Sequence, residues 1–285
     1  MNATMSALTR RGFRFKKELG QNFLFNHFAL TMIADSAGIA PGDVVVEAGA
    51  GAGSLTAVLA EKKAKVVAVE LDRVLIPFLR ERFGDNPDVR VVHGDIMKMD
   101  IDALAINEFP AASYKICSNL PYNISTAFVT RVFRELKNAE AGAILLQKEV
   151  ADKITAHPGQ EGYGMLSLAA SWYGEAKQDF EIEPDYFTPP PPVMSSVVSF
   201  RGIQKPCDVS EKDLWFIIRT MFNQRRKTVL NIVKSMKDFT PVGGLDWSRT
   251  LTNAGIDHQK RPETLSLKDF IIITGLTRGE RIADV

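Results

Sequence analysis

Cysteine and histidine are scarce in this chain of 285 residues, which contains two cysteines and four histidines. Two cysteines, Cys117 and Cys207, cannot form a disulfide framework or a structural zinc site. The histidines show no spacing typical of metal ligands: His27, His93, His157 and His258. The chain also lacks any apolar stretch near the length of about 20 residues that a membrane span requires. We therefore expect a cytoplasmic protein with no metal and no membrane partner.

An excess of one charge is also missing, since 35 Lys and Arg residues stand against 34 Asp and Glu residues. The distribution of charge is more informative, because residues 1–200 carry a net charge of −4 and residues 201–285 carry +5. The first 17 residues contain five cations and no acid: Arg10, Arg11, Arg14, Lys16 and Lys17. Basic regions at both ends indicate a polyanionic partner, although mild asymmetry also arises by chance. A basic, acid-poor start is compatible with a transit peptide as well.

The middle of the chain alternates short β-branched runs with amphipathic segments. We expect strands at 44–46, 65–69, 89–92, 114–118 and 143–146, and helices at 55–62, 72–83 and 127–136. Ser125 or Thr126 is the expected N-cap of the last helix. This alternation predicts an α/β fold, a Rossmann-like domain whose mostly parallel sheet is covered on both faces.

The pattern changes after about residue 174. Two further strands are expected at 178–182 and 195–200, on either side of a stiff proline loop at 189–192. From Ser210 the chain becomes helical. We therefore predict two domains, residues 1–203 with the sheet and residues 204–285 as a small α-helical domain.

Polar residues close four of the predicted strands: Glu47, Glu70, Asp95 and Asn119. In parallel sheets, ligands bind beyond the carboxyl ends of the strands. Four polar residues at one edge therefore predict a ligand site more strongly than any one of them alone.

A glycine-rich turn follows the first strand and reads Glu47-x-Gly49-x-Gly51-x-Gly53. A dinucleotide fingerprint would have Gly at position 54, where this chain has Ser54. A leading acid with evenly spaced glycines suits S-adenosylmethionine, which has no pyrophosphate; a turn without a ligand is the alternative.

Two of the strand-end acids have a role in this interpretation. Glu70 is placed to accept the ribose hydroxyls of such a cofactor, unless it is a solvated strand-end acid. Asp95 is placed to accept from the adenine amine, unless it is an ordinary turn aspartate.

The sequence Asn119-Leu120-Pro121-Tyr122 supplies a carboxamide, a proline-fixed backbone and an aromatic ring. The exocyclic nitrogen of adenine is a poor nucleophile because its lone pair is delocalised into the ring. Acceptors aimed at its N–H bonds, the Asn119 oxygen and a carbonyl held by Pro121, would free that lone pair for methyl transfer. Tyr122 and Phe187 are candidate stacking surfaces for the base. The alternatives are a turn that closes a strand and, for Phe187, an apolar anchor under a loop.

Three adjacent cations, Arg225, Arg226 and Lys227, follow Phe222 in a stretch that we expect to be helical. Such a cluster can bind RNA phosphates. The alternative is a solvated helix face, which is what charged runs usually are.

Together these motifs resemble the ribosomal RNA adenine dimethyltransferase family over nearly the whole chain. The matching segments follow the family order: residues 17–24 (KELGQNFL), 47–56, 70–72, 94–95, 119–126 (NLPYNIST), 147–151, 187–198 and 222–231 (FNQRRKTVLN). The resemblance implies a cofactor pocket lined by Gln21, Asn22, Leu24, Gly49, Gly51, Glu70, Asp95, Ile96 and Asn119. It implies that Asn119, Leu120, Pro121, Tyr122 and Phe187 handle the target adenine.

Two branches of this family share the core motifs. One dimethylates two adjacent adenines in a small-subunit RNA hairpin, and the other dimethylates one large-subunit adenine and confers macrolide resistance. NLPYNIST and QRRKT resemble the first branch, whereas Pro192 departs from it where a basic residue is common. That departure leaves RNA contacts by the proline loop in doubt.

The sequence therefore predicts a monomeric S-adenosylmethionine-dependent enzyme that acts on the small-subunit RNA of an immature 30S particle. The rivals are the large-subunit enzyme, a DNA adenine methyltransferase with a related Asn-x-Pro-Tyr motif, and a non-catalytic RNA-binding assembly factor on the same scaffold. The absence of an obvious DNA-reading motif opposes the second, and the presence of Asn119 and Glu70 opposes the third.

Overall fold

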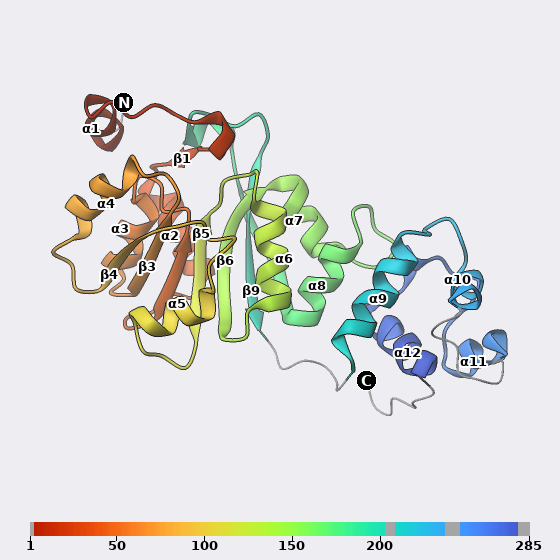
Figure 1. Cartoon of the computed structure of the whole chain (residues 1–285). Helices are drawn as coiled ribbons and strands as arrows, with labels where there is room; N and C mark the ends of the chain where they lie inside the picture. The colour runs from red at the N-terminus through yellow and green to blue at the C-terminus, as the bar shows by residue number, and fades with distance from the viewer. Residues whose placement is uncertain (1–2, 203–208, 237–245, 279–285) are drawn as a thin grey trace. The chain divides into compact units, whose positions relative to one another are not determined.

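The chain forms two compact units in the computed structural model, which describes residues 3–202, 209–236 and 246–278. The first unit comprises Met1–Asp152 and Glu175–Gly202, and the second comprises Lys153–Gly174 and Ile203–Val285 (Figure 1). Residues 153–174 thus belong to the helical unit, whereas the sequence placed them in a first domain of residues 1–203. The reason is their packing, since helix α8 (Met165–Tyr173) lies against α9 (Glu211–Phe222) and α12 (Leu267–Arg278). The predicted boundary at 204 lies outside the described residues.

A seven-stranded sheet forms the centre of the first unit, in the order β4-β3-β2-β5-β6-β9-β7. Its strands are β2 (Val44–Ala48), β3 (Lys65–Glu70), β4 (Val89–His93), β5 (Tyr114–Asn119), β6 (Ala139–Gln147), β7 (Gly174–Ile182) and β9 (Ser195–Gly202). Strands β2 to β6 pair in parallel, and β9 joins β6 antiparallel with Gln147 opposite Ser195. The predicted α/β fold with a mostly parallel sheet is confirmed.

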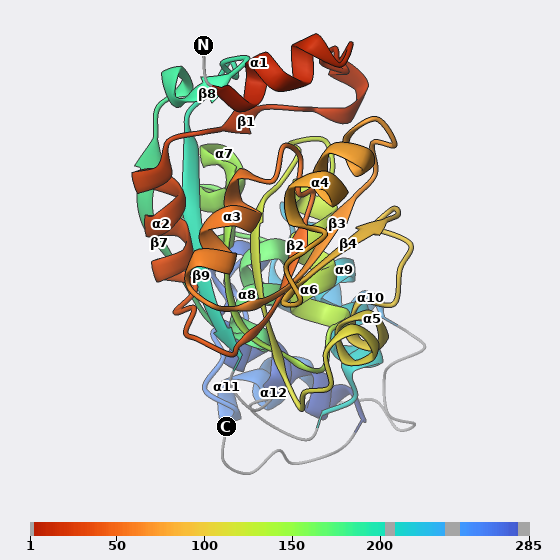
Figure 2. The ribbon, with the colours of Figure 1, turned by 90° about the vertical axis from the view of Figure 1, so that its left-hand side faces the viewer.

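Helices cover both faces of this sheet, with α2 and α3 on one side and α5 and α6 on the other (Figure 2). The helices of the unit are α1 (Ala3–Arg10), α2 (His27–Ser36), α3 (Ser54–Glu61), α4 (Leu75–Phe83), α5 (Ile101–Glu108), α6 (Ser125–Glu135) and α7 (Lys148–Thr155), the last of which runs into the second unit. Val45 of β2 and Val66 of β3 are buried in one core with residues of α2 and α3, and the other valines of both strands are buried as well, as expected for a sheet covered on both faces.

The N-terminal arm, residues 3–24, packs against the sheet at the carboxyl ends of its parallel strands. Its short strand β1 (Phe23–Leu24) pairs antiparallel with β8 (Phe187–Thr188), and Leu24 lies opposite Phe187. Apolar side chains of the arm form a small core with the glycine turn and α4, composed of Met5, Leu8, Phe13, Phe23, Ala52 and Leu75. Two short 3-10 helices, Lys17–Leu19 and Pro184–Tyr186, flank these strands.

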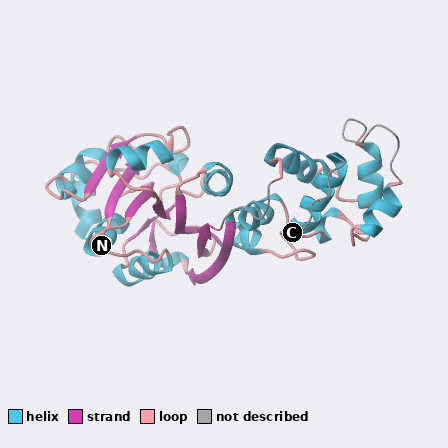
Figure 3. Ribbon diagram, turned by 90° about the horizontal axis from the view of Figure 1, so that it is seen from below, coloured by secondary structure: helices cyan, strands magenta, loops and turns pink. Residues whose placement is uncertain are grey.

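The described part of the second unit is helical, as Figure 3 shows by its lack of strands there. Its remaining elements are α10 (Val229–Ser235), α11 (Trp247–Asn253) and a 3-10 turn at Pro262–Thr264. Over the described residues, no helix combines the length and the apolar character needed to cross a membrane. In the same ranges, no group of three or more His, Cys, Asp or Glu side chains is placed to hold a metal ion.

Two local predictions were wrong. The N-cap of α6 is Ile124, which has no side-chain cap, because the Ser125 hydroxyl instead donates to the Pro121 carbonyl at 3.2 Å. Residues 223–227 form a turn between α9 and α10 instead of continuing a helix. The next helix begins after Thr228, whose hydroxyl accepts from the Asn231 amide at 3.4 Å.

Candidate active site

A pocket with a cavity volume of about 100 Å³ lies at the carboxyl edge of the parallel strands. The four polar strand-end residues of the sequence analysis all line it: Glu47, Glu70, Asp95 and Asn119. Other predicted site residues join them: Gln21, Asn22, Leu24, Gly49, Gly51, Ile96, Leu120 and Pro121. Tyr122 and Phe187 are not among its lining residues. The convergence expected from the strand order is therefore present in the fold.

The glycine turn has left-handed backbone angles and close neighbours, both of which disfavour side chains at Gly49 and Gly51. Gly49 and Gly51 have φ angles of 74° and 58°, in the left-handed region that other residues avoid. A Cβ atom at Gly49 would lie 3.1 Å from Pro121 Cδ, and one at Gly51 would lie 3.0 Å from the Phe23 ring. The turn is fastened to β3, since the amides of Gly49 and Ala50 both donate to the Val69 carbonyl, at 2.9 and 3.0 Å. The bare backbone thus forms one wall of the pocket.

Glu70 is the acid at the end of β3 and is only 6% exposed. Its Oε2 accepts from the Gly51 amide and its Oε1 from the Asp72 amide, each at 2.7 Å. Burial raises the pKa of Glu70 above its ordinary value, and the two amide bonds oppose that rise. Each oxygen keeps a lone pair beyond these bonds, so the carboxylate can still accept two ligand hydroxyls.

Glu47, at the start of the turn, is 1% exposed and accepts from the Thr56 hydroxyl at 2.5 Å. Burial raises its pKa to about 8, so this carboxyl is mainly neutral at pH 7. Glu47 therefore differs from Glu70 in its hydrogen-bond donors, since Glu70 accepts from two backbone amides and Glu47 from the Thr56 hydroxyl.

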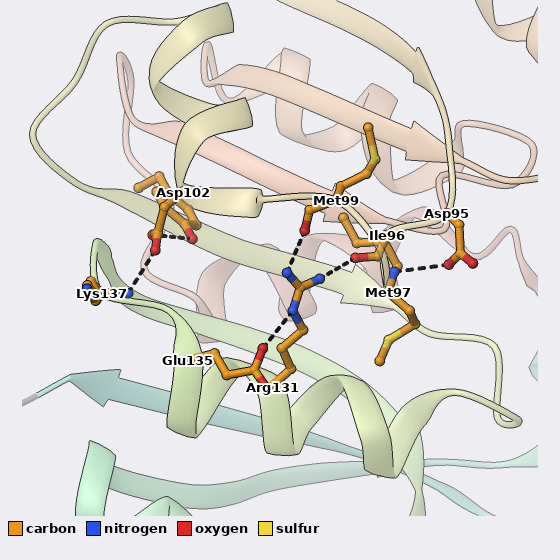
Figure 4. Close-up of polar contacts among 9 residues, drawn as sticks. Asp95, Ile96, Met97, Met99, Asp102, Arg131, Glu135 and Lys137 are labelled. Atoms are coloured by element: carbon orange, nitrogen blue, oxygen red, sulfur yellow. Dashed lines mark hydrogen bonds and ion pairs between the residues drawn. The ribbon is translucent and has the colours of Figure 1, made fainter. Parts of the chain in front are cut away.

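Asp95 and Ile96 enter the pocket on the loop that follows β4. Asp95 Oδ1 accepts from the Met97 amide at 3.0 Å, which closes a tight turn and fixes the carboxylate (Figure 4). Its Oδ2 lies 3.4 Å from Lys98 Nζ. The carboxylate has lone pairs left for a donor in the pocket, as an adenine amine would be.

The Asn119 amide is oriented by the N-terminal arm. Its Nδ2 donates to the Asn22 carbonyl at 3.3 Å, while no described residue donates to its Oδ1. The carboxamide oxygen is therefore the atom left to accept from a substrate amine.

Tyr122 is half-buried and its hydroxyl lies 2.6 Å from Ser195 Oγ, at the start of β9. Burial raises the pKa of Tyr122. This bond anchors the ring to the strand that follows the proline loop, a contact that sequence spacing could not reveal.

Phe187 does not present its ring as the sequence analysis expected. It is 3% exposed and belongs to the main hydrophobic core, because β8 pairs with β1 and sets Phe187 beside Leu24. Here Phe187 is the apolar anchor under a loop that was the alternative interpretation.

Asp72 connects the arm to the pocket, a role that the sequence analysis missed. Lys16 Nζ contacts Asp72 Oδ1 at 2.7 Å, and Gln21 Nε2 donates to Oδ2 at 3.0 Å. Burial alone would raise the pKa of Asp72, but the bonds from Lys16, Val74 and Gln21 lower it overall. The Asp72 amide also holds Glu70. The arm's Lys16 is thus committed to an internal ion pair.

The basic cluster lies in the second unit, on the turn between α9 and α10. Arg225, Arg226 and Lys227 are all exposed around a shallow hollow. The Arg225 guanidinium stacks over the Phe222 ring at 4.9 Å, and Lys227 Nζ donates to Gln224 Oε1 at 2.8 Å. The three cations therefore lie at the surface of a turn that is held by its own side chains.

Comparison with known proteins identifies the family of the chain. Residues 12–273 match the model of the family described as ribosomal RNA adenine dimethylase. Two relatives are named ribosomal RNA small subunit methyltransferase A. The relative from Alkaliphilus oremlandii is 35% identical, over 95% of this chain and 94% of its own length. The relative from Geobacter metallireducens is 38% identical, over 92% of this chain and 95% of its own length.

Solved structures share the fold. A dimethyladenosine transferase from Plasmodium falciparum has a TM-score of 0.75, at 23% identity, over 90% of this chain and 98% of its own. The 23S rRNA methyltransferase ErmE has a TM-score of 0.70, at 22% identity, over 90% of this chain and 100% of its own. Given the family match over most of its length and relatives above 30% identity, the chain belongs to the ribosomal RNA adenine dimethylase family.

Proposed function

We propose that this protein transfers methyl groups from S-adenosylmethionine to the N6 amines of two adjacent adenines in small-subunit ribosomal RNA. The observation that carries the proposal is the Asn119 carboxamide, whose nitrogen is engaged by the Asn22 carbonyl and whose oxygen faces no donor in the described chain. The names of the relatives above 30% identity support the small subunit as the source of the RNA.

The pocket residues suit this cofactor chemically. Glu70 would hold the ribose hydroxyls with the lone pairs that its amide bonds leave, and Asp95 would hold the adenine amine. Bound there, S-adenosylmethionine supplies an electrophilic sulfonium methyl.

On the substrate side, Asn119 Oδ1 accepts an N–H of the target amine and so favours a tetrahedral nitrogen with an available lone pair. Pro121 fixes the backbone beside it, and the Ser125 hydroxyl donates to the Pro121 carbonyl. Tyr122, anchored by Ser195, is the stacking surface for the base, whereas the Phe187 ring is buried in the core.

The cations Arg225, Arg226 and Lys227 would bind phosphates of the RNA, since they are exposed and lie in the part of the chain with net charge +5. We propose that the protein works as a cytoplasmic monomer on an immature 30S particle. Residues 1–203 would carry the catalytic domain and residues 204–285 an RNA-binding domain, with 153–174 packed in the latter.

The experiment is transfer of labelled methyl groups, in parallel, to 30S particles, 50S particles, naked ribosomal RNA and duplex DNA. Labelling of 30S particles at two adjacent adenines is the expected result. Labelling confined to 50S particles would indicate the large-subunit enzyme, labelling of DNA a DNA methyltransferase, and binding to 30S without labelling an assembly factor. Each of these three results would overturn the proposal.

A further inference from the structure

The loop at residues 94–100 carries Asp95 and Ile96 into the pocket, yet only part of it is held by its own backbone. The Lys98 amide donates to the Asp95 carbonyl at 2.9 Å, and the Met97 amide to Asp95 Oδ1. These bonds close the turn around Asp95 itself. They do not fasten the turn to the rest of the unit.

The Gly94 amide bonds the start of the loop to the Glu70 carbonyl of β3 at 3.0 Å, and Arg131 of α6 connects the rest of the loop to the unit. Its Nη1 donates to the Ile96 carbonyl at 2.6 Å and its Nη2 to the Met99 carbonyl at 2.5 Å. Its Nε donates to Glu135 Oε2, one turn along the same helix, at 3.0 Å. The side chain is only 16% exposed. Figure 4 shows the guanidinium between α6 and the loop, and the Asp95 carboxylate bonded to the Met97 amide.

The geometry requires arginine. A planar guanidinium can donate to two carbonyls at once and to a third acceptor behind them, which a lysine ammonium cannot reproduce. Bonds from a charged donor are roughly twice as strong as neutral ones. Without Arg131 two carbonyls of a partly buried loop would need other partners, and the turn would gain freedom.

The helix that carries Arg131 begins at Ser125, directly after the segment Asn119–Ile124. The same helix therefore joins the segment that would face the target base to the loop that would face the adenine of the cofactor. A shift of the loop by a fraction of an ångström would misplace Asp95, since hydrogen bonds weaken steeply with poor geometry.

We propose that Arg131 is a positioning residue that fixes the loop at 94–100, so that Asp95 selects a cofactor with an adenine amine. The inference rests on the proposed function for the identity of the cofactor. It predicts a defect in recognition of one end of the cofactor, and not a general loss of binding.

The test compares Arg131→Met and Arg131→Lys with the wild type. Glu135→Gln is the matched control, because it removes the negative charge beside Nε and leaves both carbonyl contacts. The probes are S-adenosylhomocysteine and S-inosylhomocysteine, which carries a carbonyl in place of the adenine amine. Calorimetry gives both affinities, and hydrogen exchange of the cofactor-free protein reports on residues 94–100.

The wild type should prefer the adenosyl compound by at least about ten-fold, because a carbonyl facing Asp95 finds no donor. Arg131→Met should lower the affinity for S-adenosylhomocysteine on the order of ten-fold and leave the affinity for S-inosylhomocysteine nearly unchanged. The ratio of the two affinities should therefore be smaller than in the wild type. Exchange at 94–100 should rise. Arg131→Lys should be intermediate, and Glu135→Gln should match the wild type, because exposed ion pairs contribute little.

Three results would overturn the inference. The first is an unchanged preference and unchanged exchange in a folded Arg131→Met. The second is an equal loss of both affinities together with a lower melting temperature, which would assign Arg131 a general structural role. The third is failure of the wild type to bind either compound, which would overturn the proposed cofactor as well, and so is distinguishable from the other two.

Discussion

Replacing Glu70 by Gln tests how the pocket holds itself together in the absence of ligand. The wild-type carboxylate accepts one backbone amide at each oxygen, from Gly51 and from Asp72, at 2.7 Å. Glutamine has the same shape but only one oxygen, and its NH₂ group is a donor. One backbone N–H would then face another donor in a site where the side chain is 6% exposed.

The magnitude follows from losing one hydrogen bond to a charged group, which costs about 1.5–3 kcal/mol. A unit of this size loses about 2–4 °C of melting temperature per kcal/mol, so the variant should melt roughly 3–12 °C lower. Cofactor affinity should fall at least about ten-fold, because one of the two ligand hydroxyls loses its acceptor.

The assay is thermal unfolding together with calorimetry of S-adenosylhomocysteine at pH 7. Glu47→Gln is the matched control in the same pocket. Since the pKa of Glu47 is raised to about 8, this change replaces one neutral group by another and keeps an acceptor for Thr56. It should not lower the melting temperature, because the glutamine carries no proton that the unfolded chain could release at pH 7. A Glu70→Gln variant that melts and binds like the wild type would refute the reasoning.

Three other predictions concern catalysis, pH and RNA. Asn119→Ala should slow single-turnover methyl transfer about 100- to 1,000-fold while the protein stays folded, and a near-normal rate would contradict the role of its oxygen. Burial raises the pKa of Glu47 from 4.5 to about 8, so the folded protein keeps a proton that the unfolded chain releases. Stability should therefore fall as pH rises from about 4.5 to 8, and Glu47→Gln should flatten that fall in denaturant unfolding measured across this range. Changing Arg225, Arg226 and Lys227 together to Gln should reduce the slope of log affinity for 30S particles against log salt by roughly 0.7–0.9 for each phosphate that the variant no longer binds. Affinity for S-adenosylhomocysteine should not change, and an unaltered salt slope would indicate a solvated surface turn.

Local sequence patterns were enough to place the sheet. Runs such as Val44-Val45-Val46 fix a buried strand through their β-branched side chains, and the glycines after them fix a tight turn. Each of these patterns depends on only a few neighbouring residues, so it can be recognised without knowledge of the fold. The order of strands then determines which polar residues share an edge, and Glu70 and Asp95 do so.

Where local signals conflicted with packing, the predictions were wrong. The charged run after Phe222 carries no local signal for a turn, and Thr228 restarts the helix through its own cap. For Phe187 the sequence left open a stacking surface or an apolar anchor under a loop, and the pairing of β8 with β1 buries its ring, which favours the anchor.

The sequence by itself determined the α/β fold, the glycine turn and the strand-end residues of the site, because each depends on neighbours in the chain. The tertiary structure alone decided how Asn119 and Arg131 are used. The Asn119 amide is oriented by Asn22, 97 residues away, and Arg131 holds a carbonyl 35 residues away. Such contacts depend on how helices and strands pack, and no spacing rule connects residues that meet only after the sheet and its helices have assembled.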